Sequence, residues 1–457
     1  MEASIRLAEV LGALSHALDL TEGQPQGHCV RCCWIGVNIG REIGLPDGQL
    51  EDLYYTLLLK DLGCSSNAAR ICDLYLADDL TFKNDFKRVD GSLAQVLRFV
   101  LTHTGANAGF SDRVRAIVNI LRNGAQISTE MIETRCQRGA EIARRMRFSE
   151  AVAGGILDLD EHWDGGGKPL GRKGVEISVL ARIALLAQVV DVFHLSSGRA
   201  AAIAEIRSRS GGWFDPAIVE AFLALADRAT FWEGLERDDI ESRVLAMEPG
   251  REAAMVDEDY LDDIAAAFAQ VIDAKSPFTF GHSERVALFT ELIAQEMGYD
   301  AARCRWLKRA ALLHDIGKLG VSNAILDHPG KPDEAGWLAI KQHPEYSQSI
   351  LARIAAFSDL AVVAGAHHER LDGKGYPRGL AGDEIDLDTR IVSTADVFDA
   401  LTAERPYRAA MPTRKALAIL NQGAGAAHDP VCIAALERVL QSSGLEAEGA
   451  VEAASGP

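Results

Sequence analysis

Histidines and aspartates gather in the second half of the chain at spacings that could build a metal centre. The segments that carry them read GHSERV, LLHDIGKLG, IKQHPEYS, AGAHHERLDGKGYP and TADVFDALT. The candidate ligands are His282, His314, Asp315, His343, His367, His368 and Asp396. Imidazole and carboxylate groups, with no thiolate among them, suit hard to borderline divalent metals. The set therefore predicts a divalent-metal site that could activate a water molecule for hydrolysis.

The HD pair carries the most specific chemistry. His314 and Asp315 are adjacent at a helix end and point in different directions, so one carboxylate can bridge two metals while the imidazole completes one of them. Lys318 follows His314 by four residues, which places both on one helical face, within reach of a bound phosphate. We therefore expect Asp315 and Lys318 to act in catalysis.

Two of these segments carry signatures of a known family. The chain reads HDIGK at residues 314–318 and HHERLDGKGYP at residues 367–377. In this combination and order it resembles the HD-GYP family, phosphodiesterases within the HD metal-dependent phosphohydrolase superfamily. The resemblance covers about residues 260–440. It implies an all-α fold whose helices converge on a metal centre, and hydrolysis of cyclic dinucleotides such as cyclic di-GMP.

The resemblance also implies how the ligands divide between two metals. The first metal would be held by His282, His314, Asp315 and Asp396, and the second by Asp315, His343, His367 and His368. Family members with a third metal carry a glutamate four residues before the first histidine, where this chain has Phe278. We therefore expect two divalent cations, iron or manganese by ligand type.

Substrate contacts follow from the same comparison. In the family, basic residues after the last aspartate grip the substrate phosphates, and here Arg405 and Arg408 follow Asp396 by nine and twelve residues. Tyr376 is the tyrosine of the GYP motif. Together with Lys318, these residues form the expected substrate-binding set.

Composition sets the wider frame. The 457 residues are 48% hydrophobic and 25% charged, as in globular proteins. The sequence contains no run of eighteen uncharged apolar residues, so it predicts no membrane span. A net charge of −19 argues against binding to a nucleic acid polymer. The N-terminus lacks the basic region of a signal peptide, so we expect a cytoplasmic protein. Cys29, Cys32 and Cys33 lack a second cysteine pair, which favours reduced, buried thiols over a zinc site.

The elements that position the ligands are helices. Segments such as EDLYYTLLLKDLG, RCRWLKRAALLHDIG and LDTRIVSTADVFDALTAE carry apolar residues at helical spacing, and strand alternation is scarce. The fold class is therefore all-α, with two tandem HD-type domains. The expected division is a first domain at 1–240, a linker at 241–258, a catalytic domain at 259–440 and a flexible tail at 441–457.

A repeated loop indicates the tandem arrangement. EHWDGGGKPLG at 161–171 matches ERLDGKGYPRG at 369–379, a spacing of 208 residues. His28 and Asp61 match His282 and Asp315 at a spacing of 254. The first half therefore has about 46 additional residues (254 − 208), expected in helical material around 73–125. Two copies of one ancestral fold explain the pattern.

The first copy has lost most ligand types. Lys60 replaces the histidine of the HD pair and Cys64 replaces the lysine. The remaining positions are filled, in this interpretation, by Cys136 for His343, Leu159 and Asp160 for the paired histidines, Lys168 for Tyr376, and Asp191 for Asp396. Residues 1–240 are therefore predicted to be catalytically inactive and to serve a regulatory or structural role.

Three functions remain open at this point. The leading one is hydrolysis of cyclic di-GMP to linear pGpG or GMP. The second is the same chemistry on 3′,3′-cyclic GMP-AMP, since tandem degenerate and intact copies occur among such enzymes. The third is a non-catalytic cyclic-dinucleotide sensor or scaffold that binds GGDEF-domain proteins through the GYP loop. A homodimer is a further expectation.

Overall fold

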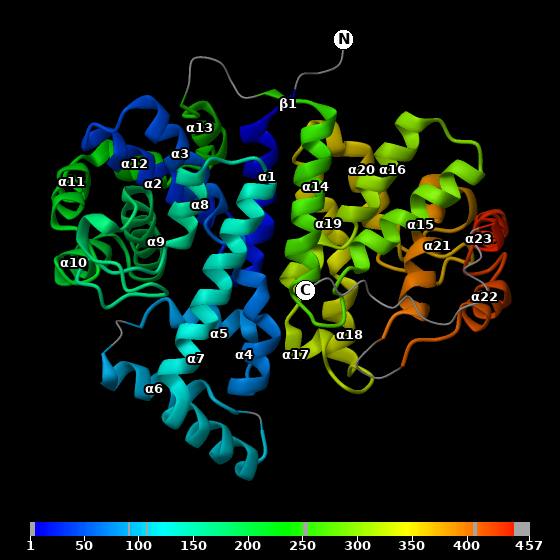
Figure 1. The fold of residues 1–457 in the computed structure, drawn as a ribbon, viewed down its shortest axis with the longest axis horizontal. Helices are drawn as coiled ribbons and strands as arrows, with labels where there is room; N and C mark the ends of the chain where they lie inside the picture. The colour runs from blue at the N-terminus through cyan, green and yellow to red at the C-terminus, as the bar shows by residue number, and fades with distance from the viewer. Residues whose placement is uncertain (1–4, 90–91, 107, 250–254, 405–408, 443–457) are drawn as a thin grey trace. The chain divides into compact units, whose positions relative to one another are not determined.

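Two compact units, both helical, make up the fold (Figure 1). The computed structural model describes residues 5–89, 92–106, 108–249, 255–404 and 409–442. One unit comprises the chain up to Ala267 together with Ser322–Ala324, and the other comprises Phe268–Val321 and the chain from Ile325 onward. The prediction of an all-α protein is confirmed.

The first unit is built mainly from α-helices of varied length. Its elements are β1 (Ile5–Arg6), α1 (Leu7–Thr21), α2 (His28–Glu42), α3 (Asp47–Leu59), η1 (Cys64–Asn67), α4 (Ala68–Tyr75), α5 (Asp79–Phe86), α6 (Leu93–His103), α7 (Phe110–Arg145), α8 (Glu150–Leu157), η2 (Gly174–Glu176), α9 (Val179–Ser197), α10 (Arg199–Ser208), α11 (Pro216–Ala226), α12 (Ala229–Leu235), α13 (Ile240–Ala246) and β2 (Met255–Val256). The helix α14 (Glu258–Asp273) spans the boundary between the units.

The second unit continues the helical pattern. Its elements are α15 (His282–Glu296), α16 (Ala301–Leu313), η3 (Ile316–Gly320), α18 (Glu334–Lys341), α19 (His343–Leu351), η4 (Ala355–Phe357), α20 (Ser358–Ala366), η5 (Gly382–Glu384), α21 (Leu387–Thr402), α22 (Thr413–Gln422) and α23 (Pro430–Ser442). The short helix α17 (Asn323–Leu326) begins with two residues of the first unit and ends with two of the second.

The boundary between the units differs from the linker expected at 241–258. That segment contains most of α13 and all of β2, and β2 pairs antiparallel with β1, with Ile5 opposite Val256. The pairing places the segment in the first unit, because a two-residue strand is stabilised only by hydrogen bonds to its partner strand. The sequence missed it because two residues are too few to show alternation.

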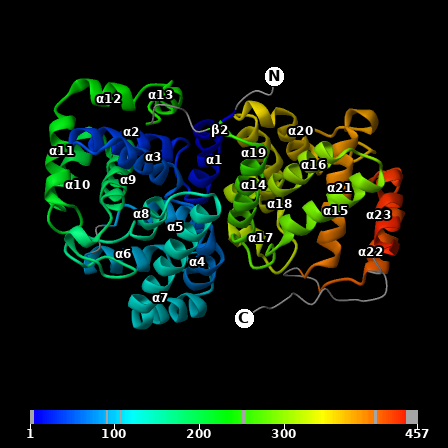
Figure 2. The same cartoon turned by 45° about the horizontal axis from the view of Figure 1, so that its top comes forward.

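Each unit has a central helix. In the first unit α2 packs against α3 and α9, and in the second α15 packs against α16 and α21 (Figure 2). Both α2 and α15 begin directly after a glycine with positive φ, Gly27 at 83° and Gly281 at 67°. A residue with a side chain rarely adopts this conformation. The turn therefore delivers a histidine, His28 or His282, as the first residue of each central helix.

The helix α9 is the only described helix that is long and apolar enough to cross a membrane, with a mean hydropathy of 1.6. Two-thirds of that apolar stretch is buried inside the structure, where α9 packs on α2, α8 and α10. This is the environment of a core helix, whose apolar residues face its neighbours on all sides.

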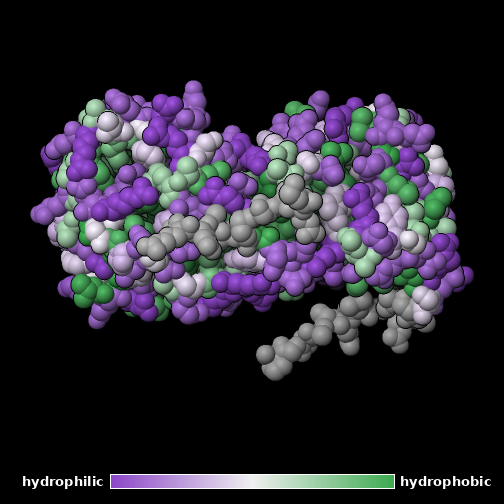
Figure 3. All heavy atoms as spheres, turned by 90° about the horizontal axis from the view of Figure 1, so that it is seen from above, coloured by the Kyte–Doolittle hydropathy of each residue, from purple (hydrophilic) through white to green (hydrophobic). Residues whose placement is uncertain are grey.

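Hydrophilic side chains predominate on the face of each unit drawn in Figure 3, with hydrophobic side chains scattered among them.

The cysteines Cys29, Cys32 and Cys33 are free and buried, as expected for α2. The additional residues expected around 73–125 fall in α4 to α6 and the first part of α7. The expected tail at 441–457 lies, from residue 443, outside the described residues.

Candidate metal centre

Six helices or turns deliver the seven candidate ligands to one place in the second unit. His282 and His343 are the first residues of α15 and α19, while His314 and His367 directly follow the last residues of α16 and α20. Asp396 lies within α21. Helix ends suit this task, since the chain can turn there and point a side chain inward. All seven side chains belong to overlapping groups of potential metal ligands.

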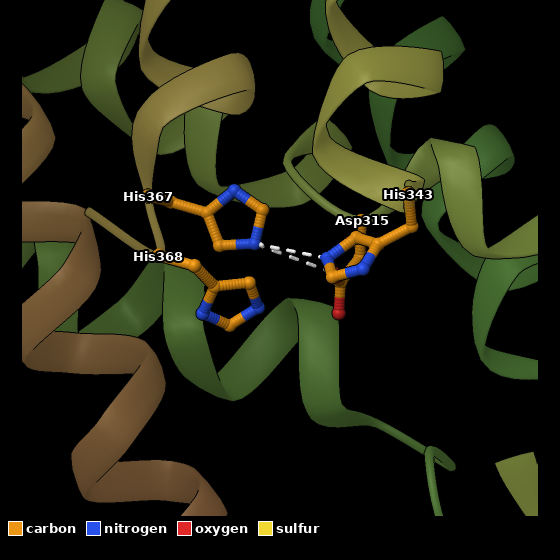
Figure 4. Close-up of side chains that lie close together, drawn as sticks. All are labelled: Asp315, His343, His367 and His368. Carbon is orange, nitrogen blue, oxygen red and sulfur yellow. Dashed lines mark hydrogen bonds and ion pairs between the residues drawn. The ribbon is translucent and has the colours of Figure 1, made fainter. Parts of the chain in front are cut away.

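The two carboxylate oxygens of Asp315 face different pairs of imidazoles. Oδ2 lies 3.5 Å from Nε2 of His282 and 3.3 Å from Nε2 of His314. Oδ1 lies 3.2 Å from Nε2 of His343 and 3.6 Å from Nε2 of His367. Figure 4 shows the second pair pointing at the carboxylate, with His368 beside them. This arrangement suits a carboxylate shared by two cations, because each oxygen can serve a separate set of imidazoles.

Asp396 complements the first imidazole pair. Its Oδ1 lies 3.3 Å from Nε2 of His282 and 3.9 Å from Nε2 of His314. Its other oxygen lies 3.9 Å from Nδ1 of His368, whose ring stands 4.1 Å from that of His367 and 5.0 Å from that of His343. The structure thus brings together every ligand predicted from the sequence.

Backbone carbonyls orient three of the imidazoles. Each Nδ1–H donates to the carbonyl three residues earlier in the chain: His314 to Ala311 at 2.6 Å, His343 to Ile340 at 2.6 Å and His367 to Ala364 at 2.7 Å. A carbonyl can only accept, so the proton lies on Nδ1 and the lone pair of Nε2 points into the site. A hydrogen bond from the ring nitrogen that does not bind metal is the usual way in which proteins fix the tautomer of a metal-binding histidine.

His282 is oriented by a carboxylate that the sequence analysis did not single out. Its Nδ1 lies 2.7 Å from Oδ2 of Asp399, which also accepts from Arg285 at 3.1 Å. Arg285 makes a second bond to the other oxygen at 2.5 Å. Both residues stand three positions after a predicted ligand, His282 and Asp396, and that spacing was the available signal.

Several buried atoms of the site lack a hydrogen-bond partner within the described part of the chain. They are Nε2 of His282, Nε2 of His314 and Oδ1 of Asp315. Buried polar groups of this kind are normally satisfied. All three point at the position where the ligands converge, so the residues present fit divalent cations.

The electrostatics of the site agree with that fit. Burial lowers the pKa of His282, but the carboxylates of Asp315, Asp396 and Asp399 outweigh it and raise the value to about 10. Burial lowers the pKa of His343 to about 4, so this imidazole is neutral at pH 7. Converging carboxylates attract positive charge, and neutral imidazoles are the form that binds metal.

The expected substrate-binding residues divide into described and undescribed ones. The ammonium group of Lys318, in η3, pairs with the carboxylate of Asp315. Burial raises the pKa of Asp315, but His314 and Lys318 outweigh it and hold the value well below its ordinary range. Tyr376 lies beside the site, its ring 4.8 Å from that of His368. Arg405 and Arg408 lie outside the described residues.

The first unit contains an equivalent site, and its geometry corrects one expected correspondence. Asp191 accepts from Nδ1 of His28 at 2.7 Å and from Arg31 at 2.6 and 3.1 Å. Asp399 makes the same contacts in the second unit, and it lies 208 residues after Asp191, the spacing of the repeated loop (399 − 191). Asp191 therefore corresponds to Asp399, which orients a ligand, and the match with Asp396 was wrong.

A second correspondence changes as well. A side chain at Gly317 would lie 2.0 Å from the carbonyl oxygen of His343, and one at Gly63 would lie 1.9 Å from that of Arg135. These equal approaches, 254 residues apart at the glycines (317 − 63), place Arg135 at the position of His343. Arg135 also lies 208 residues before His343 (343 − 135), the spacing of the repeated loop, so the prediction of Cys136 there was wrong by one residue.

The repeated loop keeps its architecture in both units. Oε1 of Glu369 accepts from the backbone N–H groups of Arg378 and Gly379 at 2.7 and 3.2 Å. In the first unit, Oε1 of Glu161 accepts from the N–H groups nine and ten residues later at 2.6 and 3.1 Å. A buried carboxylate thus closes the same turn twice, which explains why the loop persists where the ligands have gone.

Comparisons with known proteins agree with these features. The family described as HD domain matches residues 106–218 and 266–431. The chain is 55% identical over 434 residues to the 3′3′-cGAMP-specific phosphodiesterase 3 of Vibrio cholerae serotype O1, covering 95% of this chain and 94% of the relative. It is 35% identical over 206 residues to the cyclic di-GMP phosphodiesterase response regulator RpfG of Xanthomonas campestris, covering 44% of this chain and 54% of that protein.

A solved structure resembles nearly the whole chain. It is the crystal structure of a cyclic GMP-AMP specific phosphodiesterase from V. cholerae, which is 49% identical and superimposes with a TM-score of 0.67. The match covers 96% of this chain and 98% of the other. Both units therefore have counterparts in that protein.

Proposed function

Because the chain belongs to the HD domain family, we propose that it is a metal-dependent phosphodiesterase that hydrolyses a cyclic dinucleotide, with 3′,3′-cyclic GMP-AMP as its substrate. The observation that carries the chemistry is the carboxylate of Asp315, whose two oxygens face two separate imidazole pairs. The substrate rests on the 55% identity, over almost the whole chain, to a relative named for cyclic GMP-AMP.

The residues divide into two ligand sets that share Asp315. His282, His314 and Asp396 would complete the first set, and His343, His367 and His368 the second. Two divalent cations, with iron or manganese favoured by the ligand types, would supply Lewis-acid charge to the phosphate and lower the pKa of the attacking water. The protein holds these ligands in place through the carbonyls of α16, α18 and α20 and through Asp399.

Lys318 supplies a positive charge next to that centre. Its ammonium group pairs with Asp315 and retains a side-chain exposure of 19%, so it can turn toward a phosphate that enters the site. Arg405 and Arg408 are proposed to hold the remaining phosphate charge. Such contacts bind the substrate and orient its scissile bond.

The substrate proposal reverses the order of the two enzyme functions inferred from the motifs. Cyclic di-GMP was the leading candidate, but residues that read the bases lie outside the motifs, and the more extensive similarity is to a cyclic GMP-AMP enzyme. The complete ligand set speaks against a purely non-catalytic scaffold, which needs no converging metal ligands. The GGDEF partner and the homodimer stay predictions.

Substrate competition tests the proposal directly. Manganese-loaded or iron-loaded protein is incubated with equal concentrations of 3′,3′-cyclic GMP-AMP, cyclic di-GMP and cyclic di-AMP, and linear and mononucleotide products are separated by chromatography. We expect cyclic GMP-AMP to be consumed first. Preferential loss of cyclic di-GMP would overturn the substrate, and no hydrolysis of any of the three under either metal would overturn the activity.

A further inference from the structure

The ammonium group of Lys60 lies at the centre of the altered site in the first unit. Its Nζ is 3.1 Å from Nε2 of His28 and 3.2 Å from Oε1 of Gln188, and it pairs with the carboxylate of Asp61. The side chains of Lys60 and Asp61 are almost completely buried. A cation of the protein itself is therefore held by three converging side chains.

Those three partners occupy the positions of metal ligands in the second unit. His28 and Asp61 correspond to His282 and Asp315 at the spacing of 254, and Gln188 corresponds to Asp396 at the spacing of 208 (396 − 188). Lys60 replaces the fourth member of that set. The nitrogen of Lys60 thus takes the place of the first cation, with the remaining ligands arranged around it.

The position of the second cation also carries positive charge. Arg135, at the position of His343, pairs its guanidinium group with Asp160, at the position of His368. Leu159 fills the position of His367 with an apolar side chain. A guanidinium and an isobutyl group cannot ligate a metal. The residues at these positions of the first unit therefore do not fit the two divalent cations that the family implies, although two other groups there, His28 with Cys32 and Asp191 and Glu22 with Asp61 and Cys64, contain potential ligand atoms.

The orientation of His28 is nevertheless the one a metal ligand would have. Asp191 holds Nδ1, as Asp399 does for His282, so the lone pair of Nε2 faces the ammonium group of Lys60. Burial and the charge of Lys60 lower the pKa of His28, which keeps the imidazole neutral and able to accept. The second unit leaves the equivalent Nε2 without a hydrogen-bond partner among the described residues.

We propose that Lys60 and Arg135 are tethered substitutes for the two divalent cations in the first unit, which excludes metal ions and completes its fold without them. A lysine cannot dissociate from the site as a metal can. Removing metal should therefore loosen the second unit and leave the first unchanged.

Hydrogen–deuterium exchange on the full-length chain tests this inference without any activity assay. After chelation, amides of α15 and α21 should exchange at least tenfold faster, while those of α2 and α9 keep their rates. Lys60→Met should accelerate exchange in α2 and α9 with or without metal. Lys173→Met, the same change at an exposed lysine of the first unit, should not.

A gain of metal provides the second measurement. The Lys60→His/Gln188→Asp double variant rebuilds a four-ligand set, so it should bind one additional manganese or iron ion per chain by elemental analysis, and exchange in α2 and α9 should become sensitive to chelator. The proposal is overturned if chelation accelerates exchange in α2 and α9 of the unaltered protein. It is equally overturned if Lys60→Met leaves those rates unchanged.

A different observation concerns the aromatic side chains next to His368 in the second unit. The ring of Trp337, on α18, lies 6.0 Å from that of Tyr376, which in turn lies 4.8 Å from that of His368. Trp337 is 44% exposed, although tryptophan is usually well buried. Lys341, one turn later on α18, places its Nζ 5.6 Å from the centre of each of the two rings.

A cyclic dinucleotide whose phosphate is bound at the cations carries its bases one ribose away from that phosphate, so its bases reach the side chains that surround the ligands. An exposed aromatic ring offers such a base a stacking surface, and the adjacent lysine offers charge to the second phosphate. We infer that Trp337 stacks on a substrate base and that Lys341 contacts a phosphate. This inference rests on the proposed function.

Steady-state kinetics with a matched pair of variants tests it. Trp337→Ala should raise the KM for cyclic GMP-AMP about tenfold with kcat changed less than twofold, since the lost ring no longer stacks on a substrate base. Trp337→Phe should restore most of the affinity. Leu338→Ala, at the neighbouring exposed position, should have no effect. An unchanged KM for Trp337→Ala in an active enzyme overturns this inference alone, whereas inactivity of the unaltered protein overturns the proposed function.

Discussion

The carboxylate of Asp315 is the residue on which both ligand sets depend. We expect Asp315→Ala to abolish measurable hydrolysis and to lower bound metal from two ions to one or none per chain, because each set loses an oxygen. Lys318→Met should keep both ions and raise the KM, since Lys318 pairs with Asp315 without belonging to either set. Elemental analysis and kinetics on the two variants separate these outcomes. Retained turnover in Asp315→Ala would show that the centre lies elsewhere.

Protons compete with metal for His282. In the metal-free protein its pKa is raised to about 10, so the imidazole is protonated at pH 7 and must lose its proton to bind metal. We expect metal affinity to rise about tenfold per pH unit between pH 7 and pH 9, with proton release. Calorimetry in buffers of different ionisation enthalpy measures this release. A proton count of zero at pH 8 would contradict it.

His162 provides a pH effect that involves no metal ligand. It lies in the repeated loop of the first unit, stacked 4.3 Å from Trp213, and burial lowers its pKa to about 4. The folded state thus binds fewer protons than the unfolded state between pH 6.5 and pH 4, so stability is fully present above pH 6.5 and falls as the pH drops through that window. The loss is at most about 3 kcal/mol. Chemical denaturation should show a weaker pH dependence in His162→Gln.

At the scale of elements, the same aspartate–arginine ion pair between two helices recurs in both units. Asp399 and Arg285 join α21 to α15, and Asp191 and Arg31 join α9 to α2. Only the first of these ion pairs orients a metal ligand. Asp399→Asn should therefore weaken metal binding about 10–100-fold, the usual effect of losing a ligand-orienting carboxylate. Asp191→Asn should destabilise the first unit and leave metal affinity unchanged. Equal effects of both changes on metal affinity would contradict this division.

The helical elements and the ligands were predictable from the sequence because both leave local signals. Apolar residues at helical spacing identified the helices, and HDIGK and HHERLDGKGYP identified the centre. Asp399 and Arg285 escaped notice because a salt bridge between helices more than a hundred residues apart leaves no periodic pattern. Arg135 was missed because Cys136 was matched to His343 at a spacing of 207, although the repeated loop that follows has a spacing of 208.

The strand pair β1–β2 escaped prediction for a related reason. Its stability comes from pairing residues about 250 positions apart, and no local signal reports such a partner. The positions of Trp337 and Lys341 beside the centre could not be predicted either, since only the fold brings α18 to Tyr376. Function at the centre was therefore readable from the motifs, whereas the surroundings that tune it required the structure.

For the whole molecule, the division into units predicts how the chain can be cut. A fragment of residues 1–257 retains β2 beside β1, whereas a cut at 240 removes it. We expect the 1–257 fragment to fold, to hydrolyse no cyclic dinucleotide under any metal and to bind none of the added manganese. The complementary fragment, 258–457, should hydrolyse the same bond but with reduced solubility or stability. Hydrolysis by the first fragment, or a second fragment indistinguishable from the full chain, would contradict this.

The tethered cations of the first unit also bear on the order of events during synthesis. The first unit leaves the ribosome first, and its lysine and arginine arrive with the chain, so it can fold before any metal is encountered. About 200 further residues then take roughly 10–40 s to emerge. Throughout that interval the first unit, except for Ser322–Ala324, is already synthesised and needs no ion, while the second half has yet to bind its metals. Metal scarcity in the cell would consequently loosen the catalytic half alone and leave the first half unchanged, and metal added later would restore the catalytic half.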